Sequence, residues 1–200
     1  YRDVEDIEAL EATLRKAFAG QDKQSFSRDW WIWDRLRCRY VDEGRRDRNA
    51  LHVLRAVFRG WVLDWHAKLE AKGEGDLFYI FFTTTEGDKK AKWTHDGRTL
   101  VRDVHGGGYH GGWGGASRMR IYEELVLGDM LSADEKLHFK QIVHQSLGKQ
   151  FLDFKQRSQK ADNHAFGNAG GVALAIRLFP EAPQSDAASA WLDRLWAYLA

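Results

Sequence analysis

Cysteine, proline and long apolar runs are scarce in this chain. Its 200 residues include one cysteine, Cys38, and two prolines, Pro180 and Pro183. A single cysteine excludes an intrachain disulfide framework and any cysteine-based zinc module. No apolar run reaches the roughly 20 residues that a membrane-spanning helix needs, and the N-terminal residues are too charged for a secretory signal. We therefore expect no membrane partner.

The chain also lacks an excess of charge of either sign. Its 30 lysines and arginines and 29 aspartates and glutamates leave a net charge of +1 at pH 7. Such a balance provides no overall field to attract nucleic acid, while a local basic cleft stays compatible with it. We therefore expect no nucleic-acid partner.

Tryptophan and glycine, by contrast, are abundant, with nine and nineteen residues respectively. So many tryptophans suit either an aromatic core or flat platforms on which a sugar or a base stacks. Because the chain has no basic excess, a sugar is the better candidate.

Apolar residues recur at helical spacing along most of the chain, which predicts an all-α fold. The run Leu77–Thr85 is assigned to a helix like its neighbours, whereas residues 86–115 are predicted to form one long glycine-rich loop. A loop of that length is more often functional than a simple connection. Helical hairpins without a sequence repeat fit either an irregular bundle or an arc of an α/α toroid. The other predicted helices cover residues 3–18, from Ser27 or Asp29 to 42, 48–71, 116–127, 132–159, 163–179 and 185–199.

The first candidate site is the segment 162–171, with the sequence DNHAFGNAGG. An N-cap at its start places His164 in the first turn of a helix, where free amides and the helix dipole favour an anion. Asn168 follows His164 on the same ridge. Small residues here also allow tight helix packing, so a purely structural role is the alternative. We favour a ligand site, because capping alone does not require His164 and Asn168 to be aligned.

The second candidate site is the loop segment 103–115, with the sequence DVHGGGYHGGWGG. Its glycines allow the backbone to approach a ligand closely, while Tyr109, His110 and Trp113 offer proton-transfer groups and stacking faces. His105 lies in the same segment. The lysine and serine or threonine of a phosphate loop are missing, and the histidine spacing does not match a zinc motif. A flexible linker is the alternative to a substrate-facing loop.

A few further residues are candidates for substrate binding, although each has an ordinary explanation. Trp31 lies off the apolar stripe of its helix and is suited to stacking on a sugar. Arg55 and Arg59 share a face that is either solvated or binds a carboxylate. We expect His138 and His144 to be solvated or hydrogen-bonded, and we predict no metal ligand and no cofactor.

The segment 163–180, NHAFGNAGGVALAIRLFP, following tryptophan-rich amphipathic helices, resembles the heparinase II/III-like and alginate-lyase-like polysaccharide lyases. This resemblance covers about twenty residues in motif and the last hundred in pattern. It implies that residues 1–200 form one incomplete α/α toroid domain of antiparallel helical hairpins, belonging to a longer chain. It also implies a β-sandwich partner domain that this sequence does not contain.

The resemblance implies β-elimination on an acidic, uronate-containing polysaccharide. Asn163 and His164 would neutralise the uronate carboxylate, since fixed donors facing developing charge are often the largest catalytic contribution. The family's tyrosine usually lies later in the toroid than this pair, and only Tyr198 follows His164. Tyr109 and His110 are therefore our candidates for proton transfer.

Two other classes of function remain open at this stage. A glycoside hydrolase on an α/α barrel needs two carboxylates across the sugar, and no pair here stands out. A non-catalytic helical module that binds glycans would explain the aromatic residues without an acid or a base. An extracellular or periplasmic location is expected from the substrate class alone.

Overall fold

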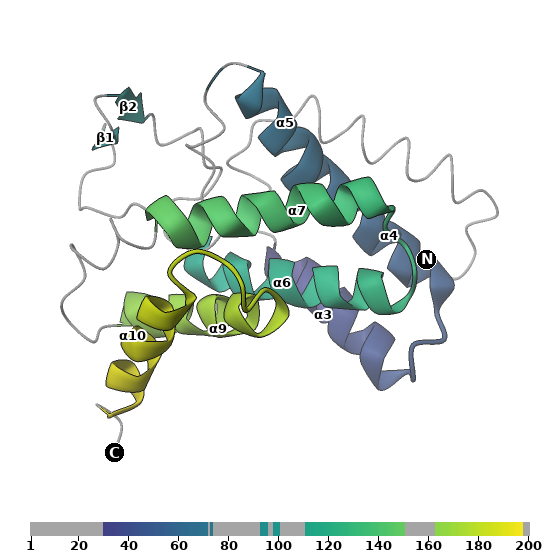
Figure 1. Cartoon of the computed structure of the whole chain (residues 1–200). Coiled ribbons are helices and arrows are strands. Elements are labelled where there is room, and N and C mark those ends of the chain that lie inside the picture. The colour runs from purple at the N-terminus through teal and green to yellow at the C-terminus, as the bar shows by residue number, and fades with distance from the viewer. Residues whose placement is uncertain are drawn as a thin grey trace.

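The chain is described by a computed structural model that covers residues 30–71, 73, 93–95, 98–100, 111–150 and 163–197. These residues are overwhelmingly helical, which confirms the predicted all-α class (Figure 1). Helices 3–18 and Leu77–Thr85 of the prediction lie outside the described residues. The α-helices are α3 (Trp30–Asp42), α4 (Arg48–Phe58), α5 (Asp64–Glu70), α6 (Gly111–Leu127), α7 (Ala133–Gln145), α9 (Asn163–Leu178) and α10 (Ser185–Ala197).

The predicted helix 48–71 is continuous but changes its winding in the middle. α4 leads into a π-helical segment, η1 (Arg59–Leu63), and α5 then continues to Glu70. A second π-helical segment, η4 (Ser146–Gln150), continues α7. π-Helical turns are rare and often lie at functional sites, because they change the direction in which later side chains point. Along the chain, η1 thus lies between the apolar face of α4 and the polar side chains of α5.

The predicted loop 86–115 contains regular structure at two places. Strands β1 (Trp93–His95) and β2 (Arg98–Leu100) pair antiparallel, with Thr94 opposite Thr99. α6 begins at Gly111 rather than at residue 116, so the predicted end of the loop was wrong. Glycine's low helix propensity is a weak preference that packing overrides, and Gly115 is already buried in this helix.

α6 and α9 pack side by side and run in the same direction (Figure 1). A Cβ atom placed on Gly170 of α9 would lie 3.7 Å from the Cβ of Ala116 in α6. Seven residues further along both helices, Arg177 of α9 forms an ion pair with Glu123 of α6 at 2.7 Å. Because both contacts occur in the same order, the two helices are parallel.

α3 lies against α6 and follows the same direction. Asp34, near its start, is 3.5 Å from Arg120. Arg45, just beyond its end, forms a bidentate pair with the buried Glu124, at 2.7 and 3.0 Å. α3 therefore crosses α6 obliquely in the same overall direction, and α6 contacts both α3 and α9.

The helices that follow α3 and α6 return in the opposite direction. Early in α4, Leu51 reaches Gly128 just beyond the end of α6, while Phe58 at the end of α4 contacts Tyr122 with a ring separation of 5.9 Å. α7 also starts beyond the end of α6, and the ring centre of its Phe139 lies 4.4 Å from that of Tyr122. α4 and α7 are thus antiparallel to α6, and each forms a hairpin with the helix before it.

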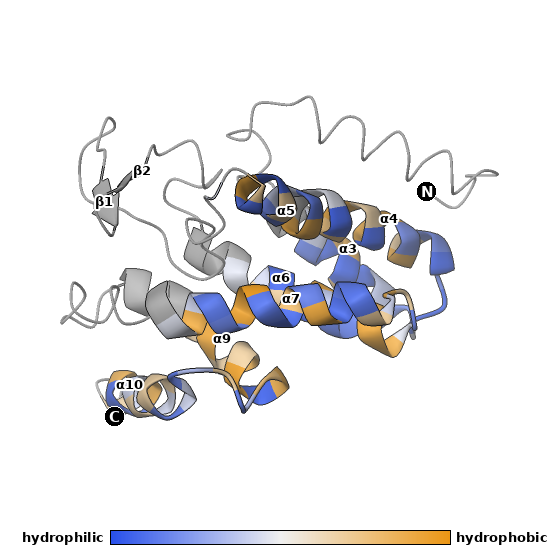
Figure 2. Cartoon of the chain, turned by 45° about the horizontal axis from the view of Figure 1, so that its top comes forward, coloured by the Kyte–Doolittle hydropathy of each residue, from blue (hydrophilic) through white to orange (hydrophobic). Residues whose placement is uncertain are grey.

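An aromatic cluster holds these helices together. The ring centre of Phe139 in α7 lies 4.9 Å from that of Phe58 in α4 and 6.1 Å from that of Phe179, which follows α9. The cluster thus joins three helices to α6. Phe58 and Phe139 are fully buried. α4 and α7 each carry hydrophobic residues on one side and hydrophilic residues on the other (Figure 2). No described helix is both long and apolar enough to cross a membrane.

Candidate functional site

The two motifs predicted from the sequence begin helices that lie side by side. α9 begins at Asn163, which places Asn163 and His164 in its first turn, and α6 begins within the glycine-rich motif at Gly111. The Arg177–Glu123 pair fixes an offset of 54 residues between the parallel helices. The first turns of α6 and α9 therefore lie at the same end of the pair (Figure 1).

The structure gives helical positions, without side chains, for several of the predicted site residues. Trp113 lies in the first turn of α6, while Asn168 lies in the second turn of α9 and Trp31 in the first turn of α3. His105, Tyr109 and His110 lie outside the described residues. The structure thus places Trp113 at the same end of the α6–α9 pair as the Asn163–His164 turn.

Arg55 and Arg59, proposed to bind substrate, lie in α4 and at the start of η1. Arg59 donates a hydrogen bond to Glu135 at the start of α7, and its side chain is 25% exposed. Arg55 is half-buried. Arg59 therefore joins η1 to α7, so a substrate carboxylate would have to compete with Glu135 for its guanidinium group.

A buried cation in the middle of α6 was not predicted from the sequence. Arg118 of α6 is 4% exposed, and burial lowers its pKa to about 10. It lies about 10 Å along the axis from Gly111, at 1.5 Å per residue.

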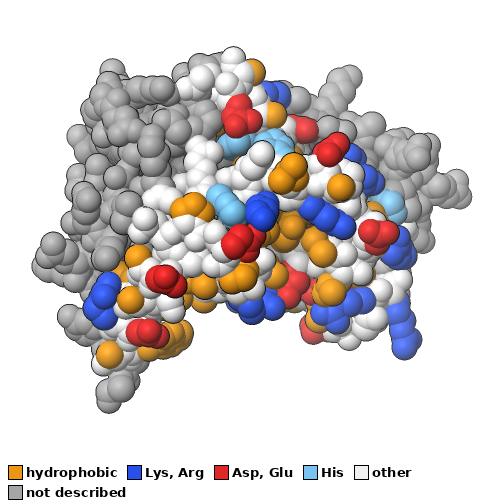
Figure 3. Space-filling view, in the orientation of Figure 1, with side chains coloured by type: hydrophobic (Ala, Val, Ile, Leu, Met, Phe, Trp, Pro, Cys, Tyr) orange, Lys and Arg blue, Asp and Glu red, His pale blue; other side chains and the backbone are white. Residues whose placement is uncertain are grey.

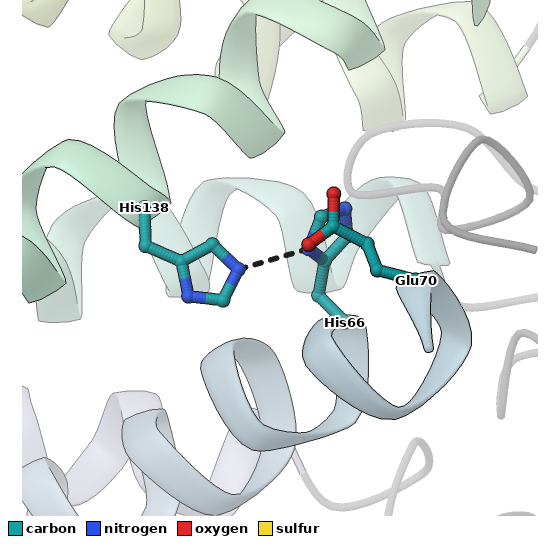
Figure 4. Close-up of side chains that lie close together, drawn as sticks. All are labelled: His66, Glu70 and His138. Atoms are coloured by element: carbon teal, nitrogen blue, oxygen red, sulfur yellow. Dashed lines mark hydrogen bonds and ion pairs between the residues drawn. The ribbon is translucent and has the colours of Figure 1, made fainter. Parts of the chain in front are cut away.

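A second cluster lies on the other side of the molecule, between α5 and α7. His66 and Glu70 are four residues apart on α5, and His138 projects toward them from α7 (Figure 4). The Nδ1 atom of His66 is 2.9 Å from Nε2 of His138 and 3.6 Å from a carboxylate oxygen of Glu70. One nitrogen or oxygen from each of the three residues lies within 4.8 Å of the others.

The environment of His66 sets its charge and orientation. His66 is 1% exposed, and burial lowers its pKa, although the nearby Glu70 acts in the opposite direction. Its Nε2–H donates to the amide oxygen of Gln145 at 3.3 Å. With Nε2 protonated, the lone pair of Nδ1 faces His138 and Glu70. His66 is thus an oriented imidazole whose Nδ1 accepts a hydrogen bond from Nε2–H of His138 and faces the carboxylate of Glu70.

The sequence contains one local signal for this cluster that the prediction did not use. His66 and Glu70 have the i, i+4 spacing that puts two side chains on the same face of a helix. His138 and Gln145 lie 72 and 79 residues away from His66 and are joined to it only by the packing of α5 against α7. The expectation that His138 is hydrogen-bonded is confirmed.

The face of the molecule that carries α7 is polar and mixed in charge. Histidine side chains lie among acidic, basic and hydrophobic ones on this face (Figure 3). Lys140 of α7 forms an ion pair with Glu181 at 2.6 Å, and His144 lies 3.8 Å from the same carboxylate. The side chain of Glu70 is 57% exposed, so the cluster around His66 is reachable from solvent through Glu70.

Comparison of this chain with models of protein families, with curated proteins and with solved structures gave no match.

Proposed function

We propose that this chain is the helical part of a polysaccharide lyase that cleaves a uronate-containing polymer by β-elimination. The observation that carries the proposal is the shared end of α6 and α9, where the glycine-rich motif and the Asn163–His164 turn begin two parallel, adjacent helices. Two motifs about fifty residues apart in the sequence would thus face one substrate.

An incomplete α/α toroid is the architecture that fits the observed helix directions best. In such a toroid, consecutive helical hairpins place parallel inner helices around a cleft, and their partners return on the outside. α3, α6 and α9 are the candidates for the inner layer, with α4, α5 and α7 as candidates for the outer layer. The cleft would then open at the end where α6 and α9 begin.

The charges at this end suit an acidic polymer. The first turns of both helices have free backbone amides and the positive ends of their dipoles, which favour anions. A uronate carboxylate bound there would meet donors from two helices.

The chemistry requires neutralisation of the carboxylate. A base removes the proton at C5, the electron pair forms the C4–C5 double bond, and the C4–O4 bond breaks as O4 takes up a proton. The carboxylate next to C5 would otherwise gain further negative charge in the transition state. Asn163 and His164 would donate hydrogen bonds to it, which stabilises that charge where it develops. Tyr109 and His110 are the proposed proton-transfer pair.

The test is the ultraviolet absorbance of the unsaturated uronate, measured with alginate, heparan sulfate, hyaluronan and chondroitin in turn. Absorbance should rise with one of these polymers. His164→Gln should lower kcat by about 100- to 1000-fold, the range found when one donor to a developing charge is removed. Retained binding of the polymer would separate a catalytic role of His164 from a structural one.

The matched control is His144→Gln, which changes a histidine of α7 away from the helix starts and should leave kcat unchanged. Release of reducing ends without absorbance would indicate a hydrolase instead, and polymer binding without cleavage would indicate a binding module. Unchanged kcat in His164→Gln would contradict the role assigned to this residue.

A further inference from the structure

The cluster of His66, Glu70 and His138 has the ligand set of a transition-metal site and lies outside the proposed lyase site. We propose that it binds one divalent transition-metal ion of the zinc type, through Nδ1 of His66, the carboxylate of Glu70 and Nε2 of His138. The ion would join α5 to α7.

The donor set suits this class of metal. Two imidazoles and one carboxylate are a common zinc ligand set, in which a water molecule completes a tetrahedron. Oxygen-only ligands, which Ca²⁺ and Mg²⁺ prefer, are not what the cluster offers. Glu70 would supply one negative charge, and the solvent-exposed side of the cluster leaves space for the fourth ligand.

The distances fit with little movement. Tetrahedral zinc with bonds of about 2.0–2.1 Å places its ligand atoms about 3.3 Å apart. The two imidazole nitrogens are 2.9 Å apart, and Nδ1 of His66 is 3.6 Å from Glu70. The remaining pair lies within 4.8 Å. Glu70 is the side chain that has to move most, and its exposure leaves it free to do so.

The hydrogen bond from His66 to Gln145 is an independent observation that supports a metal ligand. Metal-binding histidines usually donate their second ring N–H to an oxygen, which fixes the tautomer and holds the ring in place. Nε2 of His66 does so with Gln145 at 3.3 Å. Nδ1, the other ring nitrogen, faces Nε2 of His138 and the carboxylate of Glu70.

Burial also explains why three groups from two helices meet here. The polar nitrogens of His66 have to be satisfied because the residue is 1% exposed. A metal ion would replace the hydrogen bond between Nδ1 of His66 and Nε2 of His138, and would still link these residues, which are 72 positions apart in the sequence. Such a link stabilises the folded state, because the unfolded chain does not hold the three ligands together.

The experiment measures Zn²⁺ binding by calorimetry, with tag-free chain that has been dialysed against a chelator and then freed of it. One equivalent should bind, and Glu70→Gln and His138→Gln should each weaken binding by at least about 100-fold. Gln145→Leu should weaken it by about 10- to 100-fold, as is typical when a residue that orients a ligand is changed. Zn²⁺ should also raise the Tm of the unaltered chain by several degrees, and leave that of Glu70→Gln unchanged.

Two control variants share the chemistry of the ligands. Glu43→Gln removes a half-buried carboxylate that follows the end of α3 and pairs with Arg39 at i, i+4, and His144→Gln removes the other histidine of α7. Both should bind Zn²⁺ like the unaltered chain. Glu70→Gln changes an exposed side chain, so its circular dichroism should match and loss of binding would not reflect misfolding.

Two results would overturn the proposal. One is a folded chain that binds no Zn²⁺. The other is equal affinity in Glu70→Gln, His138→Gln and the unaltered chain, which would place any bound ion elsewhere. Both readouts are independent of lyase activity, so they decide the metal site whether or not the proposed function holds.

Discussion

The contact between α6 and α9 and the contact between the α4–α5 region and α7 are built in different ways. α6 and α9 approach through small residues, with Ala116 close to Gly170, and their one described ion pair, Arg177–Glu123, is largely exposed. The second contact is rich in polar groups, with Arg59 on Glu135 and His66 on both His138 and Gln145. The first contact depends on shape, whereas the second combines the buried Phe58–Phe139 ring pair with charges and hydrogen bonds.

This difference separates two kinds of information in the sequence. A contact made by small residues can be recognised from one segment, because glycine and alanine at helical spacing already indicate a close approach. A contact made by polar partners needs both segments in place. The proposed lyase site lies at the first contact and the proposed metal site at the second. Substitutions at each contact can therefore test the two sites separately.

The largest effect is expected where the aromatic cluster joins both contacts. Phe139→Ala removes a fully buried ring that packs on Phe58, Tyr122 and Phe179. It should lower the free energy of unfolding by about 3–5 kcal/mol, through lost burial and the cavity that remains. Urea unfolding followed by circular dichroism measures this, and Phe139→Leu should cost less. A loss below about 1 kcal/mol would mean that α7 is not packed as described.

Gly128→Ala tests how closely α4 approaches the end of α6. A Cβ atom at this position would overlap the side chain of Leu51, which is fully buried and has little space to move. We expect a loss of about 1–3 kcal/mol, the usual cost of an overpacked core. Combining it with Leu51→Ala should recover part of the loss. If the two changes were additive, the close approach would not be the cause.

Glu135→Gln tests the charged contact through its dependence on pH. Burial opposes ionisation of Glu135, but hydrogen bonds from Ser132 and Arg59 outweigh it, so its pKa is lowered. A lowered pKa contributes stability above the unfolded value of about 4.3, and this contribution is lost as pH falls through the folded pKa. Glutamine keeps a capping oxygen and loses the charge.

The expected difference in unfolding free energy between the unaltered chain and Glu135→Gln is about 1 kcal/mol at pH 7. This difference should shrink as the pH falls below about 4. Thermal unfolding at several pH values measures it, with Glu181→Gln as the control for loss of a carboxylate near α7. A difference that stays constant down to pH 3 would contradict a contribution from the charge of Glu135.

Gly170→Ala should raise the free energy of unfolding, whereas Gly128→Ala should lower it. Its Cβ would make an ordinary 3.7 Å contact with Ala116, and alanine favours a helix interior over glycine. We expect stabilisation by up to about 1 kcal/mol, in contrast to Gly128→Ala. Gly170→Val, which adds two further methyl groups beside Ala116, should lose this gain. Destabilisation by alanine would mean that α6 and α9 lie closer together than the described contact.

The fold could be predicted where one segment carried its own signal. Residues 48–70, 163–178 and 185–197 are helical as predicted, because each has an apolar stripe and a stop signal within the segment. The start of α6 could not be predicted, because four glycines at 111–115 indicate a loop unless the packing around the helix is known. The π-helical segments have no clear signature in the residues that form them.

The candidate sites divide in the same way. The Asn163–His164 turn was predicted because N-cap, dipole and small residues occur within ten positions. The cluster around His66 was not predicted, because two of its groups come from the HAKLE segment and the third comes from α7. The burial of Arg118 was also missed, because an arginine in a glycine-rich and polar stretch is ordinarily exposed.

The smallest expected effect decides whether α6 and α9 are held by shape. Glu123→Gln removes the ion pair with Arg177, whose side chain is 55% exposed, and exposed pairs contribute about 0.2–1 kcal/mol. We expect a loss below about 0.5 kcal/mol that disappears in 1 M salt, where charges are screened within about 3 Å. A double-mutant cycle with Arg177→Gln isolates the pair. A coupling above about 1 kcal/mol that persists in salt would mean that charge, and not the close approach at Gly170, aligns the two helix starts.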